Sequence, residues 1–251
     1  MWKGQHDVLG EEMDPLVTEP MKKTGGLVDI GEQSTFWAKE RRRRHPSHRV
    51  ISAFVEPVLA EVRATIGLDK KKTDFSILDI GCGNGYYSYY LAHDGKLVCL
   101  DFSSYMLSIN PCKQRVCALS EKLPFPDNTF DLVFCSNLLH HLETPQVALN
   151  EMERVARHHV VVAEPNRASL PLLYSLKKEE RGMRKFSLSY VVGLFQKSQL
   201  HVQSAKRMGV ILPNKMPGSL LPLFKWFNRP GFWGFYVVVI GEKQSSVGSG
   251  D

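Results

Sequence analysis

The sequence lacks several features that define particular protein classes. Its five cysteines are odd in number and form no Cys-x-x-Cys pair, so we expect reduced thiols in a cytoplasmic compartment. The amino-terminal residues are polar and contain no apolar signal region. The longest apolar run, GFWGFYVVVIG, is too short for a bilayer, which takes about 20 residues. We therefore expect a soluble, cytoplasmic protein without a transmembrane segment.

Internal repeats, metal-ligand spacings and recognisable RNA-binding modules are also missing, so no metal site is predicted. What remains is a chain of 251 residues with 43% apolar content, enough for one large α/β domain or two small ones. The net charge of +6 permits an anionic partner without demanding one. Part of it lies in the run Arg41–Arg44, which is typical of a solvated helix face.

The composition changes along the chain and suggests four segments. We expect a flexible arm over 1–35, a helical cap over 36–72, the main domain over 73–242 with substrate-side insertions in 167–230, and a flexible tail over 243–251. Within the cap, apolar residues recur every four positions, as on one face of a helix from Phe36 to Ile66. These residues are Val50, Phe54, Val58, Val62 and Ile66.

Short apolar runs then alternate with helical patterns. The predicted strands are Phe75–Ile80, Leu97–Leu100, Val116–Leu119, Phe130–Cys135, His159–Ala163, His201–Met208 and Phe232–Ile240. The predicted helices are Tyr86–His93, Ser103–Asn110, Gln146–Ala156 and 187–200. This alternation indicates a Rossmann-like, doubly wound, mostly parallel seven-stranded sheet, whose last two strands form an antiparallel edge hairpin.

A glycine-rich loop follows the first predicted strand. In LDIGCGNG the glycines Gly81, Gly83 and Gly85 alternate, so bare main chain lies where a helix begins and a ligand can approach it. Asp101 ends the next strand, where a carboxylate binds ribose hydroxyls in nucleotide-binding folds. The spacing differs from the dinucleotide pattern GxGxxG, and Asp79 would repel a pyrophosphate but suits a cationic ligand. These features favour S-adenosylmethionine over NAD.

Four phrases, LDIGCGNG, CLDFSSYML, EKLPFPDNTFDLVFCSNLLHHLE and EMERVARHHVVVAEPNR, occur in this order. In them the chain resembles the class I S-adenosylmethionine-dependent methyltransferases, in the subgroup with an LPFPDNSFD-like phrase before the fourth strand. The resemblance covers about 76–166 closely. It implies a cofactor site at Asp79, Gly81, Gly83, Asn84, Gly85, Asp101, Phe102, Cys117, Ala118, Leu119 and Asn137.

The resemblance also suggests a role for several of these residues. The glycines would pass beneath the methionyl part, Asp79 would lie near the cofactor's amino group, and Phe102 would flank the adenine. The family's acidic residue before LPF is replaced here by Cys117 and Ala118. Adenine recognition would then fall to backbone groups or to a nearby polar residue such as Ser120.

The acceptor side has no comparable signature, because aligning a nucleophile with a methyl group needs no fixed residue type. His140 and His141 are candidate general bases, with a structural hydrogen bond as the alternative. For Glu164 the alternative to a substrate-side role is a satisfied loop carboxylate. The substrate-side candidates are Trp37, His45, Glu164, Asn166, Tyr174 and Trp226.

These features together predict a methyltransferase that acts by in-line displacement on a small, partly hydrophobic acceptor. One alternative is an RNA or protein methyltransferase that uses the basic amino-terminal segment. A second is a non-catalytic cofactor-binding scaffold. The apolar segment 212–230 is expected to cover the acceptor, to contact a membrane surface peripherally, or to pack as core.

Overall fold

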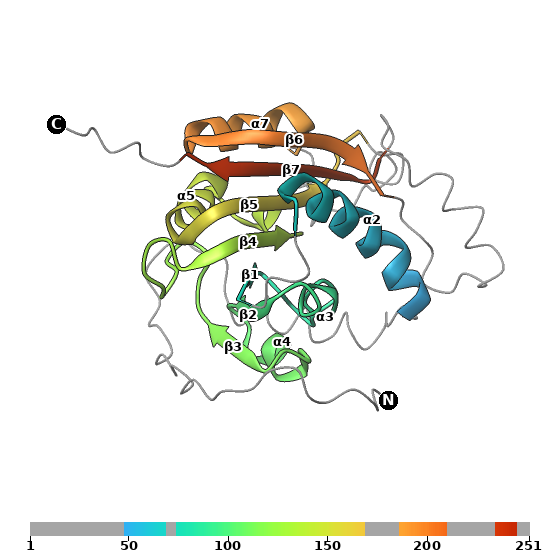
Figure 1. The fold of residues 1–251 in the computed structure, drawn as a ribbon, viewed down its shortest axis with the longest axis vertical. Helices are drawn as coiled ribbons and strands as arrows, with labels where there is room; N and C mark the ends of the chain where they lie inside the picture. Colours follow the sequence, from blue (N-terminus) through green and yellow to red (C-terminus); the bar gives the residue numbers. More distant parts are fainter. Residues whose placement is uncertain (1–47, 69–73, 169–185, 210–233, 245–251) are drawn as a thin grey trace.

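A computed structural model describes residues 48–68, 74–168, 186–209 and 234–244. A seven-stranded sheet of order β3-β2-β1-β4-β5-β7-β6 forms its centre (Figure 1). The strands are β1 Ser76–Ile80, β2 Lys96–Asp101, β3 Gln114–Cys117, β4 Phe130–Ser136, β5 Ala156–Pro165, β6 Leu200–Met208 and β7 Tyr236–Lys243. The helices are α2 His48–Ile66, α3 Ser88–Leu91, α4 Ser104–Ile109, η1 Leu139–His141, α5 Pro145–Val155 and α7 Leu188–Lys197.

The predicted fold class is confirmed. Strands β3, β2, β1, β4 and β5 pair in parallel, and β7 pairs antiparallel with both β5 and β6. The carboxyl ends of the parallel strands therefore meet at one edge of the sheet, where ligands bind in open α/β folds.

Several predicted boundaries were wrong. The third strand spans Gln114–Cys117 instead of Val116–Leu119, and on this edge strand the exposed Arg115 and Cys117 alternate with half-buried neighbours. Ala118 and Leu119 thus belong to the loop beyond it. The helix expected over Tyr86–His93 contracts to α3, and the last strand continues to Lys243. Residues 36–47 of the long predicted helix lie outside the described residues.

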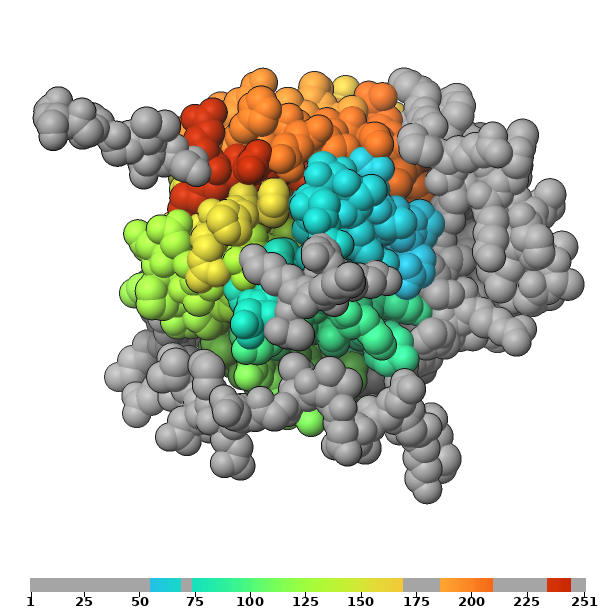
Figure 2. Space-filling model, in the orientation of Figure 1, coloured from blue at the N-terminus to red at the C-terminus, as the bar shows by residue number. Residues whose placement is uncertain are grey.

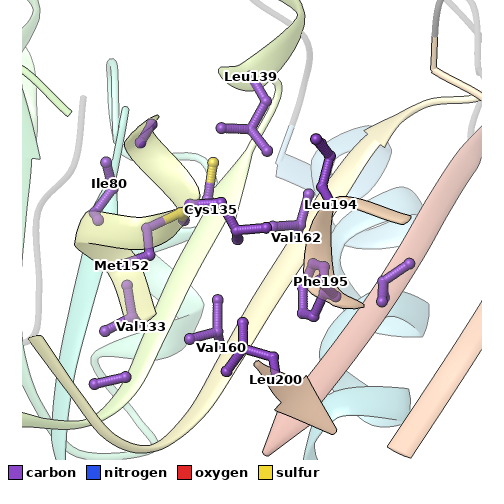
Figure 3. Close-up of a cluster of buried hydrophobic side chains, with 14 of the residues drawn as sticks. Ile80, Val133, Cys135, Leu139, Met152, Val160, Val162, Leu194, Phe195 and Leu200 are labelled. Atoms are coloured by element: carbon purple, nitrogen blue, oxygen red, sulfur yellow. The ribbon is translucent and has the colours of Figure 1, made fainter. Parts of the chain in front are cut away.

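Helices cover both faces of the sheet. One apolar cluster joins α2, α3 and α4 to one face, and a second joins α5 and α7 to the other. Figure 3 shows the second cluster, in which Val133 and Cys135 of β4 and Val160 and Val162 of β5 lie among residues of the helices. Their neighbours along each strand face the first cluster, which explains why central strands read as unbroken apolar runs.

Helix α2 packs against β5, β6 and β7 (Figure 1), and its amino-acid sequence includes Pro57 (Figure 2 shows the same face in space-filling form). Of its predicted apolar stripe, Val58 and Val62 are buried. Glu61 fixes its position, because the carboxylate accepts hydrogen bonds from Ser204 Oγ at 2.7 Å and Lys206 Nζ at 2.8 Å on β6. Among the described helices, none has the length and apolar character needed to cross a membrane.

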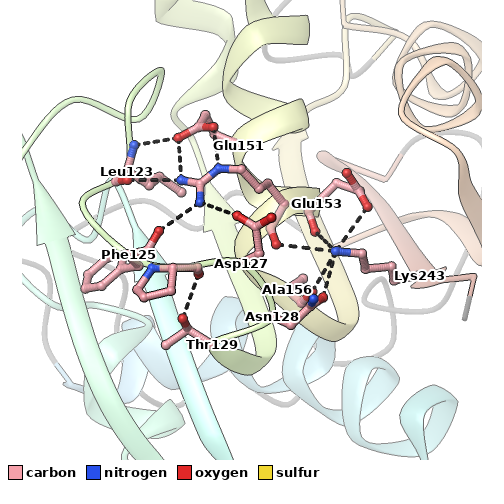
Figure 4. A network of polar contacts seen from close by, with 11 residues as sticks. Leu123, Phe125, Asp127, Asn128, Thr129, Glu151, Glu153, Ala156 and Lys243 are labelled. Carbon is pink, nitrogen blue, oxygen red and sulfur yellow. Dashed lines mark hydrogen bonds and ion pairs between the residues drawn. The ribbon is translucent and has the colours of Figure 1, made fainter. Parts of the chain in front are cut away.

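The LPFPDN phrase forms a loop that Arg154 of α5 holds in place (Figure 4). Its guanidinium donates to the carbonyls of Phe125 at 2.8 Å and Leu123 at 3.1 Å, and pairs with Asp127 at 2.8 Å. Glu151 binds Arg154 from the same helix at 2.7 Å and also accepts from Leu123 N. The phrase therefore has a structural basis as the loop that leads into β4.

We expect Arg154→Ala to lower the free energy of unfolding by about 1–3 kcal/mol, because two part-buried carbonyls lose their donor. Chemical denaturation would measure this. Lys96→Ala is the matched control, since Lys96 forms only an exposed pair with Asp74 and such pairs contribute about 0–1 kcal/mol. Equal denaturation midpoints for the two variants would contradict the role assigned to Arg154.

Candidate functional site

The glycine loop after β1 turns through three left-handed residues, with φ of +67° at Gly81, +51° at Gly83 and +86° at Gly85. A Cβ at Gly81 would lie 3.0 Å from Leu138, and one at Gly85 would lie 2.7 Å from Pro111. Packing within the protein therefore requires these two glycines. At Gly83 the added atom would meet only the terminal methyl of Met106, at 3.3 Å.

Asp101, at the end of β2, holds this loop. One carboxylate oxygen accepts from Gly83 N at 2.9 Å and the other from Ser103 N at 2.8 Å. Burial raises the pKa of this carboxyl, and the two amides oppose the rise. A carboxylate oxygen accepts more than one hydrogen bond, so each can bind a ligand hydroxyl as well.

Asp79 is a second buried carboxyl beside the loop. It is 2% exposed and accepts a hydrogen bond from Ser88 Oγ at 2.6 Å. Burial, together with the nearby charge of Asp101, raises the pKa of Asp79 to about 7 although Ser88 opposes the shift. A cation placed beside Asp79 would favour its ionised form.

A pocket of about 420 Å³ opens beside the loop, at the carboxyl edge of the parallel strands. Eleven predicted site residues line it: Asp79, Gly81, Gly83, Asn84, Asp101, Phe102, Ala118, Leu119, Asn137, His140 and His141. The lining also includes Met106, Ser120, Glu121, Leu138, Leu142, Glu143 and Tyr236. The sequence therefore identified eleven of the 23 residues that line the pocket.

Two predicted cofactor residues do not line this pocket. The α-carbon of Gly85 faces Pro111 and Asn110, so its position serves the turn. Cys117 is exposed on the edge strand, and its thiol contacts the Phe102 carbonyl at 3.4 Å. The polar groups near the expected adenine end are instead Ser120 and Glu121, whose side chains are joined by a hydrogen bond of 2.7 Å.

Two of the substrate-side candidates, Glu164 and Asn166, are buried and do not line the pocket. Glu164 is 0% exposed, and its oxygens accept from Leu138 N at 2.9 Å and Leu139 N at 2.8 Å and pair with His140 Nδ1 at 2.6 Å. The alternative, a satisfied carboxylate, is what the structure has. Asn166 is 1% exposed and donates to the Gly234 carbonyl at 2.7 Å. Four further candidates lie outside the described residues: Trp37, His45, Tyr174 and Trp226.

The two histidines differ in environment although their ring centres are 3.9 Å apart. Burial and the neighbouring His140 lower the pKa of His141 to about 3, so His141 is neutral near pH 7 and a weak base. His140 is paired with the buried Glu164. Of these two histidines, His140 therefore remains the candidate base.

The pocket wall also contains a residue that no motif identifies. Tyr236 begins β7, and its hydroxyl accepts a hydrogen bond of 3.2 Å from Asn137 Nδ2. Asn137 itself has a φ of +55° and donates its N–H to the Ala163 carbonyl. The antiparallel pairing of β7 with β5 brings Tyr236 to this point, which only the folded sheet reveals.

The charges around the pocket test which cofactor the site fits. Two buried carboxyls, Asp79 and Asp101, line it, and none of its described lining residues is lysine or arginine. A pyrophosphate would meet no compensating cation there. A ligand with sulfonium and ammonium charges and a ribose fits, since Asp79 offers an anionic oxygen and Asp101 offers free acceptor positions.

Comparisons with known proteins agree with this geometry. Residues 78–163 match the family described as "Methyltransferase domain". An uncharacterised protein of Methanocaldococcus jannaschii is 38% identical over 118 residues, covering 46% of this chain and 52% of its own. A demethylmenaquinone methyltransferase of Staphylococcus epidermidis is 29% identical over 196 residues, 69% of this chain and 78% of its own.

A crystal structure of a SAM-dependent methyltransferase from Aquifex aeolicus has the same fold, with a TM-score of 0.58, 19% identity, and coverage of 83% of this chain and 98% of its own. The chain spans between 37% and 52% of the length of the first three curated relatives that it matches. All residues that line the pocket, except Tyr236, lie within the matched segment. Residues 78–163 match a methyltransferase domain, and the chain has the fold of an S-adenosylmethionine-dependent methyltransferase.

Proposed function

We propose that the protein transfers a methyl group from S-adenosylmethionine to a small, partly hydrophobic acceptor. The proposal rests mainly on one observation, which is that two groups of residues line the same pocket. The glycine loop and Asp101 form one region, and His140, His141 and Leu142 form the other. A methyl donor bound at the first region would lie in the same pocket as the second.

When bound, S-adenosylmethionine supplies an electrophilic methyl group on sulfur, with a neutral thioether as leaving group. Asp101 would hold the ribose hydroxyls, Asp79 the amino end, and the loop at Ala118–Glu121 the adenine. The aromatic and aliphatic side chains of Tyr86, Leu138 and Leu142 would exclude water from the reacting atoms. This alignment accounts for much of what catalysis requires in an in-line displacement.

The acceptor class rests on the character of the pocket as a whole. The pocket lining is mostly apolar, which suits a ring or an alkyl portion of a small molecule. The similarity to a demethylmenaquinone methyltransferase, which spans 78% of that protein, agrees with a small-molecule acceptor.

Incubation with methyl-labelled S-adenosylmethionine and a fractionated extract tests the proposal. Label is expected in a small-molecule fraction, with stoichiometric formation of S-adenosylhomocysteine. Transfer into RNA or protein, with binding that weakens steeply as salt rises, would instead support the alternative that uses the basic segment. Cofactor binding without transfer to any fraction would support a scaffold.

The raised pKa of Asp79 predicts a pH-dependent affinity for S-adenosylmethionine. Below about pH 7 the free carboxyl is protonated, and a cation must displace that proton. Affinity should therefore rise with pH, by roughly 25-fold between pH 5.5 and 7.5 if only the ionised carboxyl binds the cation. Isothermal calorimetry would measure this rise and, in buffers of different ionisation enthalpy, the accompanying proton release.

Asp79→Asn is the control for this pH dependence. It keeps the shape and stays neutral, so affinity should be lower and nearly constant over the same range. Asp101 and the Cys82 thiol both interact electrostatically with Asp79, and both remain in the variant. A pH dependence that survives in Asp79→Asn would assign it to Asp101 instead.

A further inference from the structure

A buried polar pair, His140 and Glu164, lies at the pocket. His140 lies in η1, directly after β4, and its side chain is 2% exposed. Its Nδ1 lies 2.6 Å from Oε2 of Glu164, which ends β5 and is 0% exposed. Because a carboxylate can only accept, the pairing makes Nδ1 the protonated nitrogen of a neutral His140.

The other ring nitrogen has no such partner. Nε2 of His140 is buried and makes no hydrogen bond with any residue in the described part of the chain. In the tautomer that Glu164 selects, Nε2 carries an unused lone pair, and leaving such a group unsatisfied costs about 1–3 kcal/mol. His140 also belongs to the pocket wall. A buried, fixed and unsatisfied acceptor at a ligand pocket requires an explanation.

Resting on the proposed function, we infer that His140 Nε2 removes a proton from the methyl acceptor, and that Glu164 is the positioning residue that fixes its tautomer. The acceptor then belongs to the class of protic nucleophiles, such as a phenol or another acidic hydroxyl. A tertiary amine or a thioether has no proton to lose and would make no use of the pair.

The step balances without a further reactant. The acceptor O–H bond breaks and its proton goes to Nε2. The oxygen electron pair forms the new O–CH₃ bond as the carbon–sulfur bond breaks, and that bonding pair stays on sulfur as a thioether. The imidazolium that forms lies against the Glu164 carboxylate, which stabilises its charge.

Three titratable residues surround the pair of His140 and Glu164, and none of the three is a strong base near pH 7. His141 of η1 is neutral near pH 7 and a weak base. Cys135 of β4 and Tyr236 of β7 both have pKa values raised by burial and by the charge of Glu164, so both are neutral as well. No second anion competes for the imidazolium among these neighbours.

Two substitutions separate the chemical role from the structural one. In His140→Asn the amide nitrogen replaces Nδ1, so the hydrogen bond to Glu164 is retained while Nε2 is removed. In Glu164→Gln, the two amide donors, Leu138 N and Leu139 N, keep the carbonyl oxygen on their side. The Gln amide nitrogen then faces Nδ1 and donates to it, which forces the proton onto Nε2. His201→Asn, an exposed histidine on β6, is the control.

The first measurement needs no acceptor. In ¹⁵N-labelled protein bound to S-adenosylhomocysteine at pH 7, NMR should find His140 protonated at Nδ1 and unprotonated at Nε2. Glu164→Gln should reverse this. A wild-type His140 that carries its proton on Nε2, or on both nitrogens, would overturn the inference.

The second measurement uses 2-naphthol and N,N-dimethyl-2-naphthylamine as probes with S-adenosylmethionine. His140→Asn and Glu164→Gln should each reduce kcat for 2-naphthol by roughly 100-fold or more. The deficit of His140→Asn should shrink as pH rises and the phenol ionises unaided, which a purely structural defect would not produce. Methylation of the amine should be unchanged in both variants, as should both reactions in His201→Asn.

The results distinguish this inference from the proposed function. Wild-type rates for 2-naphthol in His140→Asn, or an equal loss with both probes at every pH, would overturn the base assignment while leaving methyl transfer intact. A wild-type protein that binds the cofactor and methylates neither probe would count against the proposed acceptor class. The tautomer measurement would then decide on His140 by itself.

Discussion

Gly83→Val is expected to abolish S-adenosylmethionine binding, with a loss of affinity of roughly 100-fold or more, which corresponds to about 2.8 kcal/mol or more. Gly83 lines the pocket, and an added Cβ would meet only the Met106 methyl, at 3.3 Å. The branched side chain would therefore fill ligand space instead of displacing a packed neighbour. Calorimetric titration at constant pH would measure the loss.

The matched control for this prediction is Gly67→Val. Gly67 also has a left-handed φ, +61°, and a Cβ there would meet nothing within 4 Å. Both variants place a β-branched residue in the same strained region of φ, so their costs to folding should be similar. Only the Gly83 variant should lose the cofactor. Wild-type affinity in both, or an equal loss in both, would contradict the contact assigned to Gly83.

The cofactor half of the site was largely predictable because it is built from strand ends. Gly81 and Asp101 each follow an apolar run, and carboxyl ends of parallel strands share one edge of a sheet. Periodicity therefore placed them together without coordinates. The reason for each glycine was not predictable, because it depends on Leu138 and Pro111, which approach Gly81 and Gly85 only in the folded chain.

The acceptor half was harder to predict because it depends on strand register. His140 and Glu164 were separate candidates in the sequence, 24 positions apart. The parallel register that sets Ser136 of β4 beside Ala163 of β5 brings them into contact. A one-residue slip would turn each side chain to the other face, so a local pattern does not carry this information. Tyr236, contributed by the antiparallel β7, was missed for the same reason.

The prediction of secondary structure was wrong where local propensity conflicts with tertiary contacts. The aromatic run after the glycine loop predicted a helix of eight residues, yet α3 spans only Ser88–Leu91. Tyr87 and Tyr90 are buried in the cluster that also contains residues of α2, so both pack in the core although only Tyr90 is helical. At the edge strand β3, the apolar run over Val116–Leu119 was read as strand, although its second half forms the pocket loop.

Asp101→Ala is expected to lower the affinity for S-adenosylmethionine by roughly 100-fold or more, since hydrogen bonds to a charged group contribute about 1.5–3 kcal/mol each. Two effects combine in this variant. The ribose would lose its acceptors, and Gly83 N and Ser103 N would lose the carboxylate that holds the loop in its binding shape. We therefore also expect a lower melting temperature without ligand, and a much smaller increase on adding the cofactor.

Asp74→Ala is the control for Asp101→Ala, because Asp74 is also an aspartate paired by its side chain but lies exposed, away from the pocket lining. It should change neither the dissociation constant nor the melting temperature appreciably. Asp101→Asn refines the test. It keeps the volume but turns an amide N–H₂ toward one of the two backbone donors, so it should fall between Asp101→Ala and the wild type in stability while binding remains weak. A dissociation constant for Asp101→Ala equal to that of the wild type would remove Asp101 from the ligand contacts and leave it only as the anchor of the glycine loop.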